Sequence, residues 1–269
     1  MGMPVSVLMA VYKNDRTDWF KQAVDSMIRQ THQPDEILVV VDGPVGKELE
    51  TAIRSYGKKI KAIWLAENKG LWNALNVGLD TAKNELVARM DSDDIAVEDR
   101  IAKQLDMFLE DENLVLAGGQ IQEFEGDIDN LTTRRQVPLV HEDIVRYAKY
   151  RSPFNHPTVM YKRSVIKKWG GYSALMRTED YDLWVRLLMA GCKTANHPDV
   201  LTYYRLNENN QKRKTSWTQK KESLALCKRF YSFGFLSKKE YVAAVGGRLL
   251  FFALPTTLKT YVYKKVLRK

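Results

Sequence analysis

The stretch Leu86-Val87-Ala88-Arg89-Met90-Asp91-Ser92-Asp93-Asp94 contains the clearest signal for the fold. Its first part, Leu86–Met90, is a short and nearly continuous apolar run, and its second part is acidic. A run of this kind, ending abruptly in polar residues, is typical of a parallel strand that is buried on both faces. We therefore expect a buried strand at Leu86–Met90 that ends in a cluster of carboxylates.

Three similar runs precede it, at Val5–Val11, Glu36–Val41 and Ile60–Leu65. Between them, apolar residues recur at helical spacing. The two clearest sets are Trp19, Phe20, Ala23, Val24, Met27 and Ile28, and Leu71, Ala74, Leu75, Leu79 and Ala82. Strands that alternate with helices predict an α/β fold with an open, mostly parallel sheet and right-handed crossovers.

Polar groups follow each of the four expected strands. They are Tyr12-Lys13-Asn14, Asp42-Gly43, Glu67-Asn68-Lys69-Gly70 and Asp91-Ser92-Asp93-Asp94. In open α/β sheets, a ligand binds beyond the carboxyl ends of the strands. The four groups should therefore meet at one crevice, although they are far apart in the chain.

The spacing of Asp91 and Asp93 suits a divalent cation, and Asp94 adds a third charge. Magnesium and manganese prefer oxygen ligands and keep several waters, so two carboxylates suffice. Acidic triplets also occur in solvated turns. The position directly after a buried strand favours the cation site, and a cation there would screen a diphosphate.

Further along, Thr178-Glu179-Asp180 opens a helix whose apolar face contains Leu183, Trp184, Leu187 and Leu188. Thr178 is a suitable N-cap, and acids suit the positive end of a helix. Asp180 is ordinarily ionised at neutral pH, so it could accept a proton as a general base. The alternative is that Glu179 and Asp180 only stabilise the helix, and Asp182 is expected to be structural.

Charge is distributed unevenly along the 269 residues. Residues 205–269 contain 16 Lys or Arg and 3 Asp or Glu. Residues 1–204 contain 26 Lys or Arg and 30 Asp or Glu. Helical patterns are expected at about 217–232 and 237–252, after a mobile loop at 206–215. The stretch Leu258–Leu267 then interleaves tyrosines with lysines, as interfacial segments do. We expect this tail to meet an anionic membrane surface; the alternative is a packed helix with solvated lysines.

Two cysteines without paired Cys or His spacing argue against a disulfide framework and a structural zinc site. They favour a reducing, cytoplasmic compartment. The start has no basic region before its apolar stretch, so no secretory signal is expected. No apolar run approaches the roughly 20 residues that cross a bilayer. The protein is expected to be soluble or to rest on a membrane.

Five motifs occur in one order along the chain. They are Val5–Val11 with Tyr12-Lys13-Asn14, Val41-Asp42-Gly43, Glu67–Leu71 with Asn76 and Gly78, Arg89–Asp94, and Glu179–Trp184. Together, over about residues 4–205, they resemble the family 2 glycosyltransferases, above all bacterial members that build exopolysaccharide and O-antigen repeat units. The resemblance implies a GT-A fold, an inverting mechanism and a nucleotide-sugar donor, commonly a UDP-sugar. It divides the chain into a transferase domain, residues 1–205, and a basic helical extension, residues 206–269.

The resemblance also implies roles for single residues. The donor site would comprise Val11, Tyr12, Asp42, Asn68, Gly70, Arg89, Asp91 and Ser92. Within it, Val11 and Tyr12 would line the base and ribose, and Asp42 would accept a hydrogen bond from uracil. Asp93 would be the main metal ligand, with Asp91 nearer the ribose and donor sugar. Many relatives have a second Asp after the Asp42 position, whereas this chain has Gly43 and Pro44.

The same resemblance makes Asp180 the general base, with Glu179 beside it against the acceptor. Trp184 and His156 are weaker candidates for acceptor contacts, and core packing is the commoner role for both residue types. Arg205 and the run Lys212-Arg213-Lys214 could clamp phosphates, although an exposed charge run is the commoner explanation.

The resulting hypothesis is a hexosyltransferase that uses Mn²⁺ or Mg²⁺ and a UDP-sugar. The hexose would be glucose or galactose in a β linkage, on a glycan or lipid-linked acceptor. The enzyme would lie in the cytoplasm, peripheral at the inner face of the cell membrane. A sugar nucleotidyltransferase would instead release pyrophosphate, and a glycoside hydrolase would need neither nucleotide nor metal. A nucleic-acid-binding protein is disfavoured because the body is acidic and no aromatic platform is visible, so no nucleic acid is expected as a partner.

Overall fold

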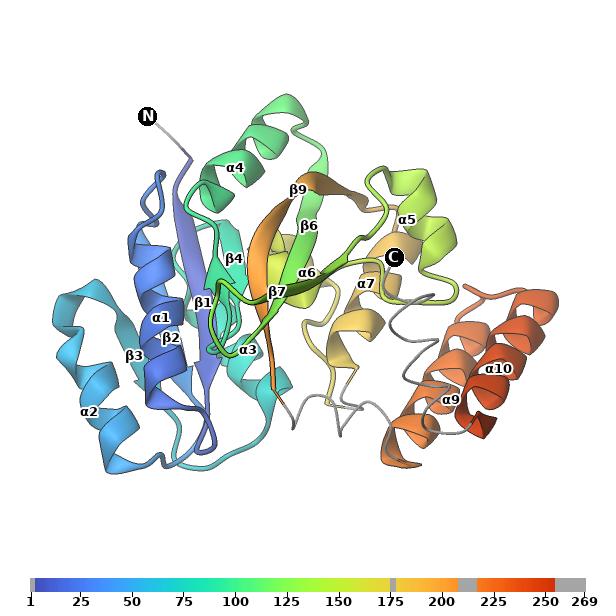
Figure 1. The fold of residues 1–269 in the computed structure, drawn as a ribbon. Helices are drawn as coiled ribbons and strands as arrows, with labels where there is room; N and C mark the ends of the chain where they lie inside the picture. The colour runs from blue at the N-terminus through green and yellow to red at the C-terminus, as the bar shows by residue number, and fades with distance from the viewer. Residues whose placement is uncertain (1–2, 175–177, 208–216, 255–269) are drawn as a thin grey trace.

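A computed structural model of the chain describes residues 3–174, 178–207 and 217–254. These residues form a nine-stranded sheet in the order β3-β2-β1-β4-β8-β6-β9-β5, with β7 paired to β6 (Figure 1). The strands are β1 (Val5–Val11), β2 (Glu36–Val41), β3 (Lys61–Trp64), β4 (Leu86–Met90), β5 (Ile95–Ala96), β6 (Leu114–Glu125), β7 (Leu131–Arg135), β8 (Met160–Lys162) and β9 (Lys193–Leu206).

The sheet is mixed, with its parallel part in the first half of the chain. β1 pairs in parallel with β2 and β4, and β2 pairs in parallel with β3. β8 is antiparallel to both β4 and β6, so β6 runs in the direction of β4, and β9 is parallel to β6. The carboxyl ends of β1, β2, β4 and β9 therefore lie at the same edge of the sheet.

Helices cover both faces of this sheet (Figure 1). They are α1 (Thr17–Ile28), α2 (Lys47–Ser55), α3 (Leu71–Thr81), α4 (Arg100–Glu110), α5 (His141–Tyr147), α6 (Arg163–Lys168) and α7 (Glu179–Met189). Alternate residues of the strands point to opposite faces, so β1 buries Val7 and Met9 with α1 and α4, and Leu8 with α3. Two apolar cores result, one on each face.

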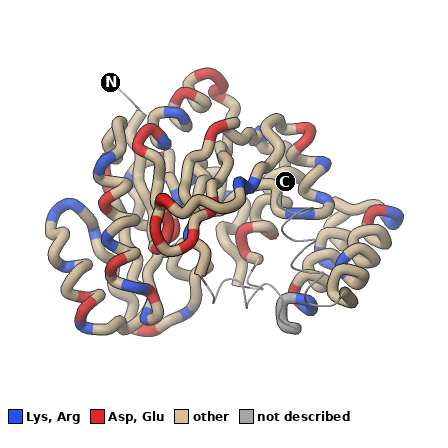
Figure 2. Tube along the Cα trace, viewed as in Figure 1, with Lys and Arg blue, Asp and Glu red and all other residues tan. Residues whose placement is uncertain are grey.

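Two further helices, α9 (Trp217–Ser232) and α10 (Lys238–Ala253), lie side by side at one end of the molecule (Figure 1). A third apolar cluster joins α9 to α7 through Tyr181, Val185, Leu226 and Phe230. Charged residues gather at the first turn of α10 (Figure 2). After that turn, its sequence has one further charged residue, Arg248. Among the described residues, no helix combines the length and apolar character needed to cross a membrane.

The α/β prediction is confirmed, and three of the four expected strands have the expected bounds. The third, β3, is one residue shorter at each end than the expected range Ile60–Leu65. The sheet also contains two long strands, β6 and β9, which have 12 and 14 residues. Residues 208–215 of the expected loop and the tyrosine-lysine stretch Leu258–Leu267 lie outside the described residues.

Candidate active site

The acidic cluster after β4 is compact. Ligand atoms of Asp91, Asp93 and Asp94 all lie within 4.8 Å of one another. Asp94 is fully buried, and its Oδ2 has no hydrogen-bond partner among the described residues. Burial and the Asp91 carboxylate raise the pKa of Asp93 to about 7, and burial also raises the pKa of Asp94. Three close carboxylates, one of them buried with an unpartnered oxygen, fit a divalent cation, which favours their ionised form.

A fourth carboxylate, Asp15, joins this cluster from the loop between β1 and α1. Its Oδ2 accepts hydrogen bonds from the Ser92 hydroxyl at 2.8 Å and from the Tyr12 backbone N–H at 3.1 Å. Burial raises the pKa of Asp15 to about 6. The sequence analysis missed Asp15, although it directly follows the polar group Tyr12-Lys13-Asn14. Ser92, an expected donor contact, is engaged by Asp15 in this structure.

Arg89 is the next-to-last residue of β4, two positions before Asp91, and is 2% exposed. Its Nη2 donates to Asp91, whereas Nε and Nη1 have no partner among the described residues. Burial raises the pKa values of Asp93 and Asp180, and the positive charge of Arg89 lowers both. The charge of Arg89 therefore acts on both the acidic cluster and the expected base. Behind it, the buried Arg100 donates to the Arg89 carbonyl at 2.7 Å.

Asp42, at the end of β2, organises the neighbouring loop. Its two carboxylate oxygens accept the backbone N–H groups of Lys69 and Gly70, each at 2.9 Å. Asn68 in turn donates its side-chain amide to the Asp42 carbonyl at 3.1 Å. Each carboxylate oxygen has a second acceptor position, so a contact with uracil stays a prediction. Gly43 is required here, because its φ is +84° and a Cβ would lie 2.5 Å from the Asn68 nitrogen.

The remaining donor residues differ in accessibility. Tyr12 is 39% exposed at the carboxyl edge, where a base could contact it. Val11 is 1% exposed and packs in the core, so only its backbone could line the ribose. The backbone carbonyl of Val11 already accepts a hydrogen bond from the Asp42 N–H at 2.7 Å. Gly70, with a φ of +95°, precedes the first turn of α3.

Glu179 and Asp180 occupy the first turn of α7, at the same end of the molecule as the strand ends. Burial raises the pKa of Asp180, and the charges of Arg89 and Arg135 partly oppose this. Thr178 occupies the N-cap position but makes no side-chain cap bond. Asp182 faces the other way and pairs with Arg186 and Arg229, so its expected structural role is confirmed.

His156 and Trp184 form an aromatic group behind the site. His156 Nε2 lies 3.1 Å from the Tyr172 hydroxyl, and burial lowers its pKa well below the ordinary value. Trp184 is 0% exposed and packs edge-on against Phe154 and His156. A fully buried ring offers no face on which a sugar can stack. The acceptor contact expected for Trp184 is therefore corrected to core packing.

The phosphate-clamp hypothesis also fails for Arg205. Its Nε donates to the Asp93 carbonyl, its Nη1 to the Gly126 carbonyl and its Nη2 to Gln22 Oε1, at 2.8, 3.1 and 2.7 Å. The side chain is buried and braces the acidic cluster. The run Lys212-Arg213-Lys214 lies outside the described residues.

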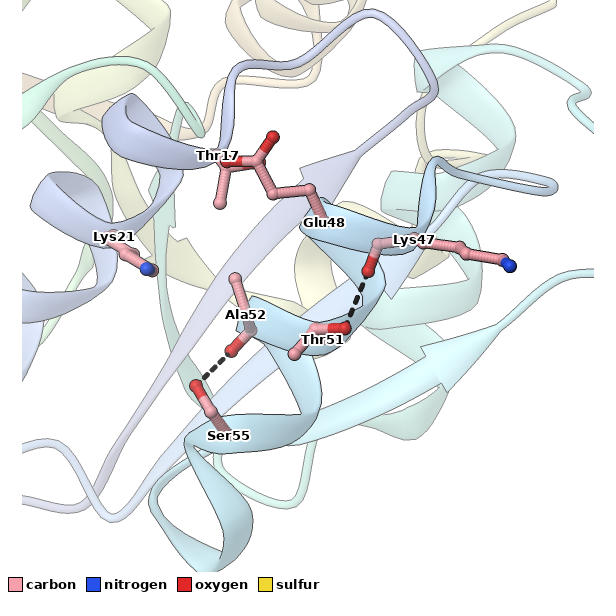
Figure 3. Close-up of a pocket in the computed structure, with 7 residues that line it drawn as sticks. All are labelled: Thr17, Lys21, Lys47, Glu48, Thr51, Ala52 and Ser55. Atoms are coloured by element: carbon pink, nitrogen blue, oxygen red, sulfur yellow. Dashed lines mark hydrogen bonds between the residues drawn. The ribbon is translucent and has the colours of Figure 1, made fainter.

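A surface hollow between α1 and α2 is separate from these groups (Figure 3). It is lined by Thr17, Lys21, Lys47, Glu48, Thr51, Ala52 and Ser55. The hydroxyls of Thr51 and Ser55 already donate to backbone carbonyls of α2, each at 2.7 Å. The hollow contains none of the predicted site residues, so the candidate active site is the carboxyl edge of the sheet.

A family model matches the part of the chain that contains this acidic cluster. The model described as "Glycosyl transferase family 2" matches residues 6–170. The chain belongs to glycosyltransferase family 2. An uncharacterised glycosyltransferase of Haemophilus influenzae is 36% identical over 99% of this chain and 100% of its own length. A UDP-Gal:alpha-D-GlcNAc-diphosphoundecaprenol beta-1,3-galactosyltransferase of Escherichia coli is 34% identical over 98% of this chain and 96% of its own.

Solved structures agree on the fold. A mannosyltransferase from Pyrobaculum calidifontis, solved with GDP-Man and Mn²⁺, superposes with a TM-score of 0.66 at 16% identity. The match covers 94% of this chain and 71% of that one. This glycosyltransferase therefore has the GT-A fold and is an enzyme of the sugar-transferring class, as the sequence motifs predicted.

Proposed function

We propose that this glycosyltransferase moves a hexose from a UDP-sugar to a lipid-linked glycan acceptor, with inversion at the anomeric carbon. The observation that carries the proposal is the placement of Arg89, which contacts Asp91 and electrostatically influences Asp180. Arg89 would thereby act on both a donor site and a base at one edge of the sheet. The similarity to the galactosyltransferase of Escherichia coli supports galactose as the hexose. Similarity to an O-antigen biosynthesis glycosyltransferase of Escherichia coli supports bacterial surface polysaccharide as the product.

Asp93 and Asp91 would hold a divalent cation, Mn²⁺ or Mg²⁺, with Asp94 adding negative charge behind them. When bound, the cation would neutralise the diphosphate of the donor. Arg89 would add a fixed positive charge through its two unpartnered nitrogens. A buried guanidinium that is already in place stabilises developing negative charge without reorganisation.

Asp180 would take the proton from the acceptor hydroxyl as that oxygen forms its bond to the anomeric carbon. The bond from this carbon to the diphosphate oxygen breaks in the same displacement, and UDP leaves with the electron pair. Burial strengthens Asp180 as a base because it raises the pKa of the carboxyl. Glu179, in the same turn, would contact the acceptor, and His156 would line the site as a neutral imidazole.

The acceptor is proposed to be lipid-linked because the Escherichia coli relative acts on a diphosphoundecaprenol. A lipid-linked acceptor places the enzyme at the inner face of the cell membrane. The basic tail, residues 206–269, would contribute attraction to the anionic surface. Nucleic acid is not proposed as a partner.

The proposal is tested by incubating the protein with UDP-galactose or UDP-glucose, Mn²⁺ and a synthetic GlcNAc-diphosphate-lipid. Formation of UDP together with a β-linked disaccharide lipid is the expected result. Release of pyrophosphate would indicate a nucleotidyltransferase, and cleavage of simple glycosides without metal would indicate a hydrolase. Either result would overturn the proposed reaction.

A further inference from the structure

The outer face of α10 is apolar and exposed. Val242, Leu249 and Leu250 are 61%, 43% and 69% exposed, respectively. Gly246 and Ala253 lie on the same side of the helix by helical spacing and are also exposed. Over these three turns the outer face has no charged side chain. Isolated apolar residues on a surface are common, but a continuous face of one helix is not.

Hydrogen bonds and an ion pair join the inner side of α10 to the rest of the protein, and they fix the direction in which its outer face points. Arg248 donates to the Ser223 hydroxyl at 2.7 Å and to the Tyr150 carbonyl at 3.1 Å. Glu240 pairs with Lys149 at 2.5 Å. Ser237 and Glu240 also form a reciprocal capping box at the start of the helix. The helix therefore cannot turn its apolar face inward without breaking these contacts.

Basic residues precede and follow this face in the sequence. Lys238 and Lys239 are exposed in the first turn, and residues 255–269, which follow the helix, contain five Lys or Arg and no Asp or Glu. An apolar face flanked by positive charge complements a lipid surface with anionic headgroups. A second copy of the chain would place lysines against lysines, which disfavours self-association through this face.

We propose that the outer face of α10 lies on an anionic lipid surface, with Val242, Leu249 and Leu250 below the headgroups. α9 packs between α10 and α7, the helix that begins with Glu179-Asp180. The proposed membrane contact and the proposed base would thus lie on helices that pack against one another through α9. The inference deepens the proposed function, because a lipid-linked acceptor would be presented at the same surface.

The test is co-sedimentation of the full-length protein with vesicles of phosphatidylcholine, with and without phosphatidylglycerol. The variant Leu250→Glu places a charge on the outer face. Leu109→Glu is the matched control, because Leu109 is 68% exposed on α4, outside this face. We expect the wild type and Leu109→Glu to bind phosphatidylglycerol vesicles. Leu250→Glu should lose about tenfold in binding, since a charge opposes insertion below the headgroups.

Three results would overturn the inference: no vesicle binding by the wild type, equal binding by Leu250→Glu, or a wild-type dimer that Leu250→Glu dissociates in light scattering. The second result would assign the attraction to the basic tail alone. Transfer to a water-soluble acceptor is measured in parallel and should be unchanged in Leu250→Glu. Failure of transfer in the wild type and every variant would count against the proposed function. The vesicle-binding results would still test the membrane contact of α10 independently.

Discussion

The backbone N–H of Arg205 donates to the carboxylate of Asp94 at 2.8 Å, which joins the end of β9 to the acidic cluster after β4. The Arg205 guanidinium continues this brace by donating to the Asp93 carbonyl. It lies between the rings of Trp19 and Phe124, with its central carbon 5.0 and 4.5 Å from their centroids. A residue 111 positions along the chain therefore helps to hold the expected metal ligands.

Arg205→Ala should raise the Mn²⁺ concentration needed for half-maximal transfer several-fold. The guanidinium donates to the Asp93 carbonyl and braces the acidic cluster, so its loss should leave the carboxylates less well placed for a cation. The free energy of unfolding should also fall by about 2–3 kcal/mol, because charged hydrogen bonds are lost. Arg16→Ala is the control, since Arg16 also covers Trp19 but pairs with the exposed Asp18. Equal metal requirements in the two variants would contradict the bracing role.

Gly43→Ala should weaken UDP binding by at least about tenfold and lower the stability by about 1–2 kcal/mol. A Cβ at this position would meet the Asn68 nitrogen at 2.5 Å and displace the loop that Asp42 holds. Gly46→Ala is the matched control, because nothing lies within 4 Å of a Cβ there. Calorimetric titration of UDP checks the affinity, and thermal unfolding checks the stability. An unchanged UDP affinity in Gly43→Ala would separate this loop from the nucleotide.

Asp180→Asn should keep donor binding and lose transfer by about 10²–10⁴-fold, the usual contribution of a general base. Asp182→Asn should behave in the opposite way. Asp182 pairs with Arg186 and Arg229, so its neutralisation should lower the stability and leave the transfer rate near that of the wild type. Single-turnover rates and unfolding curves of both variants test this contrast. A fully active Asp180→Asn enzyme would remove the base assignment.

The rate of transfer should decrease on the acid side of its pH profile, and the midpoint of this acid limb should lie above the ordinary pKa of an aspartate. The Asp180 carboxylate must be ionised to accept a proton, and burial raises its pKa. Activity should therefore fall as the pH drops through this raised value. Arg135 lowers the pKa of Asp180, so Arg135→Gln should move the limb to higher pH. Arg134→Gln serves as the control, and a limb that moves equally in both variants would contradict the prediction.

Much of the fold could be predicted because β1, β2 and β4 are buried on both faces. Such strands leave an uninterrupted apolar pattern, and their bounds were predicted correctly. β6 and β9 could not be read in the same way. β9 contains polar residues such as Asn196 and Asp199, and its pairing with β6 is irregular. The reversed strand β8 is three residues long, too short for a periodic signal.

The candidate site was predictable where its residues adjoin one another in sequence. Asp91, Asp93 and Asp94 are an example, because one motif contains all three. Asp15 and Arg205 were not recognised in their roles, because they reach the cluster across 77 and 111 residues. The burial of Trp184 depends on segments far along the chain that pack against it. Its place on an apolar helix face is consistent with burial but could not establish it from the sequence.

The central claim is that a metal-dependent nucleotide site lies at Asp93, and titration calorimetry of UDP with and without Mn²⁺ tests it most directly. GDP and dTDP serve as nucleotide controls, and Asp106→Ala serves as a control for removal of an exposed acid on α4. We predict that UDP binds the wild type and Asp106→Ala only with Mn²⁺, and that Asp93→Ala abolishes this binding. Equal binding of UDP by Asp93→Ala, or binding that is independent of Mn²⁺, would contradict the account.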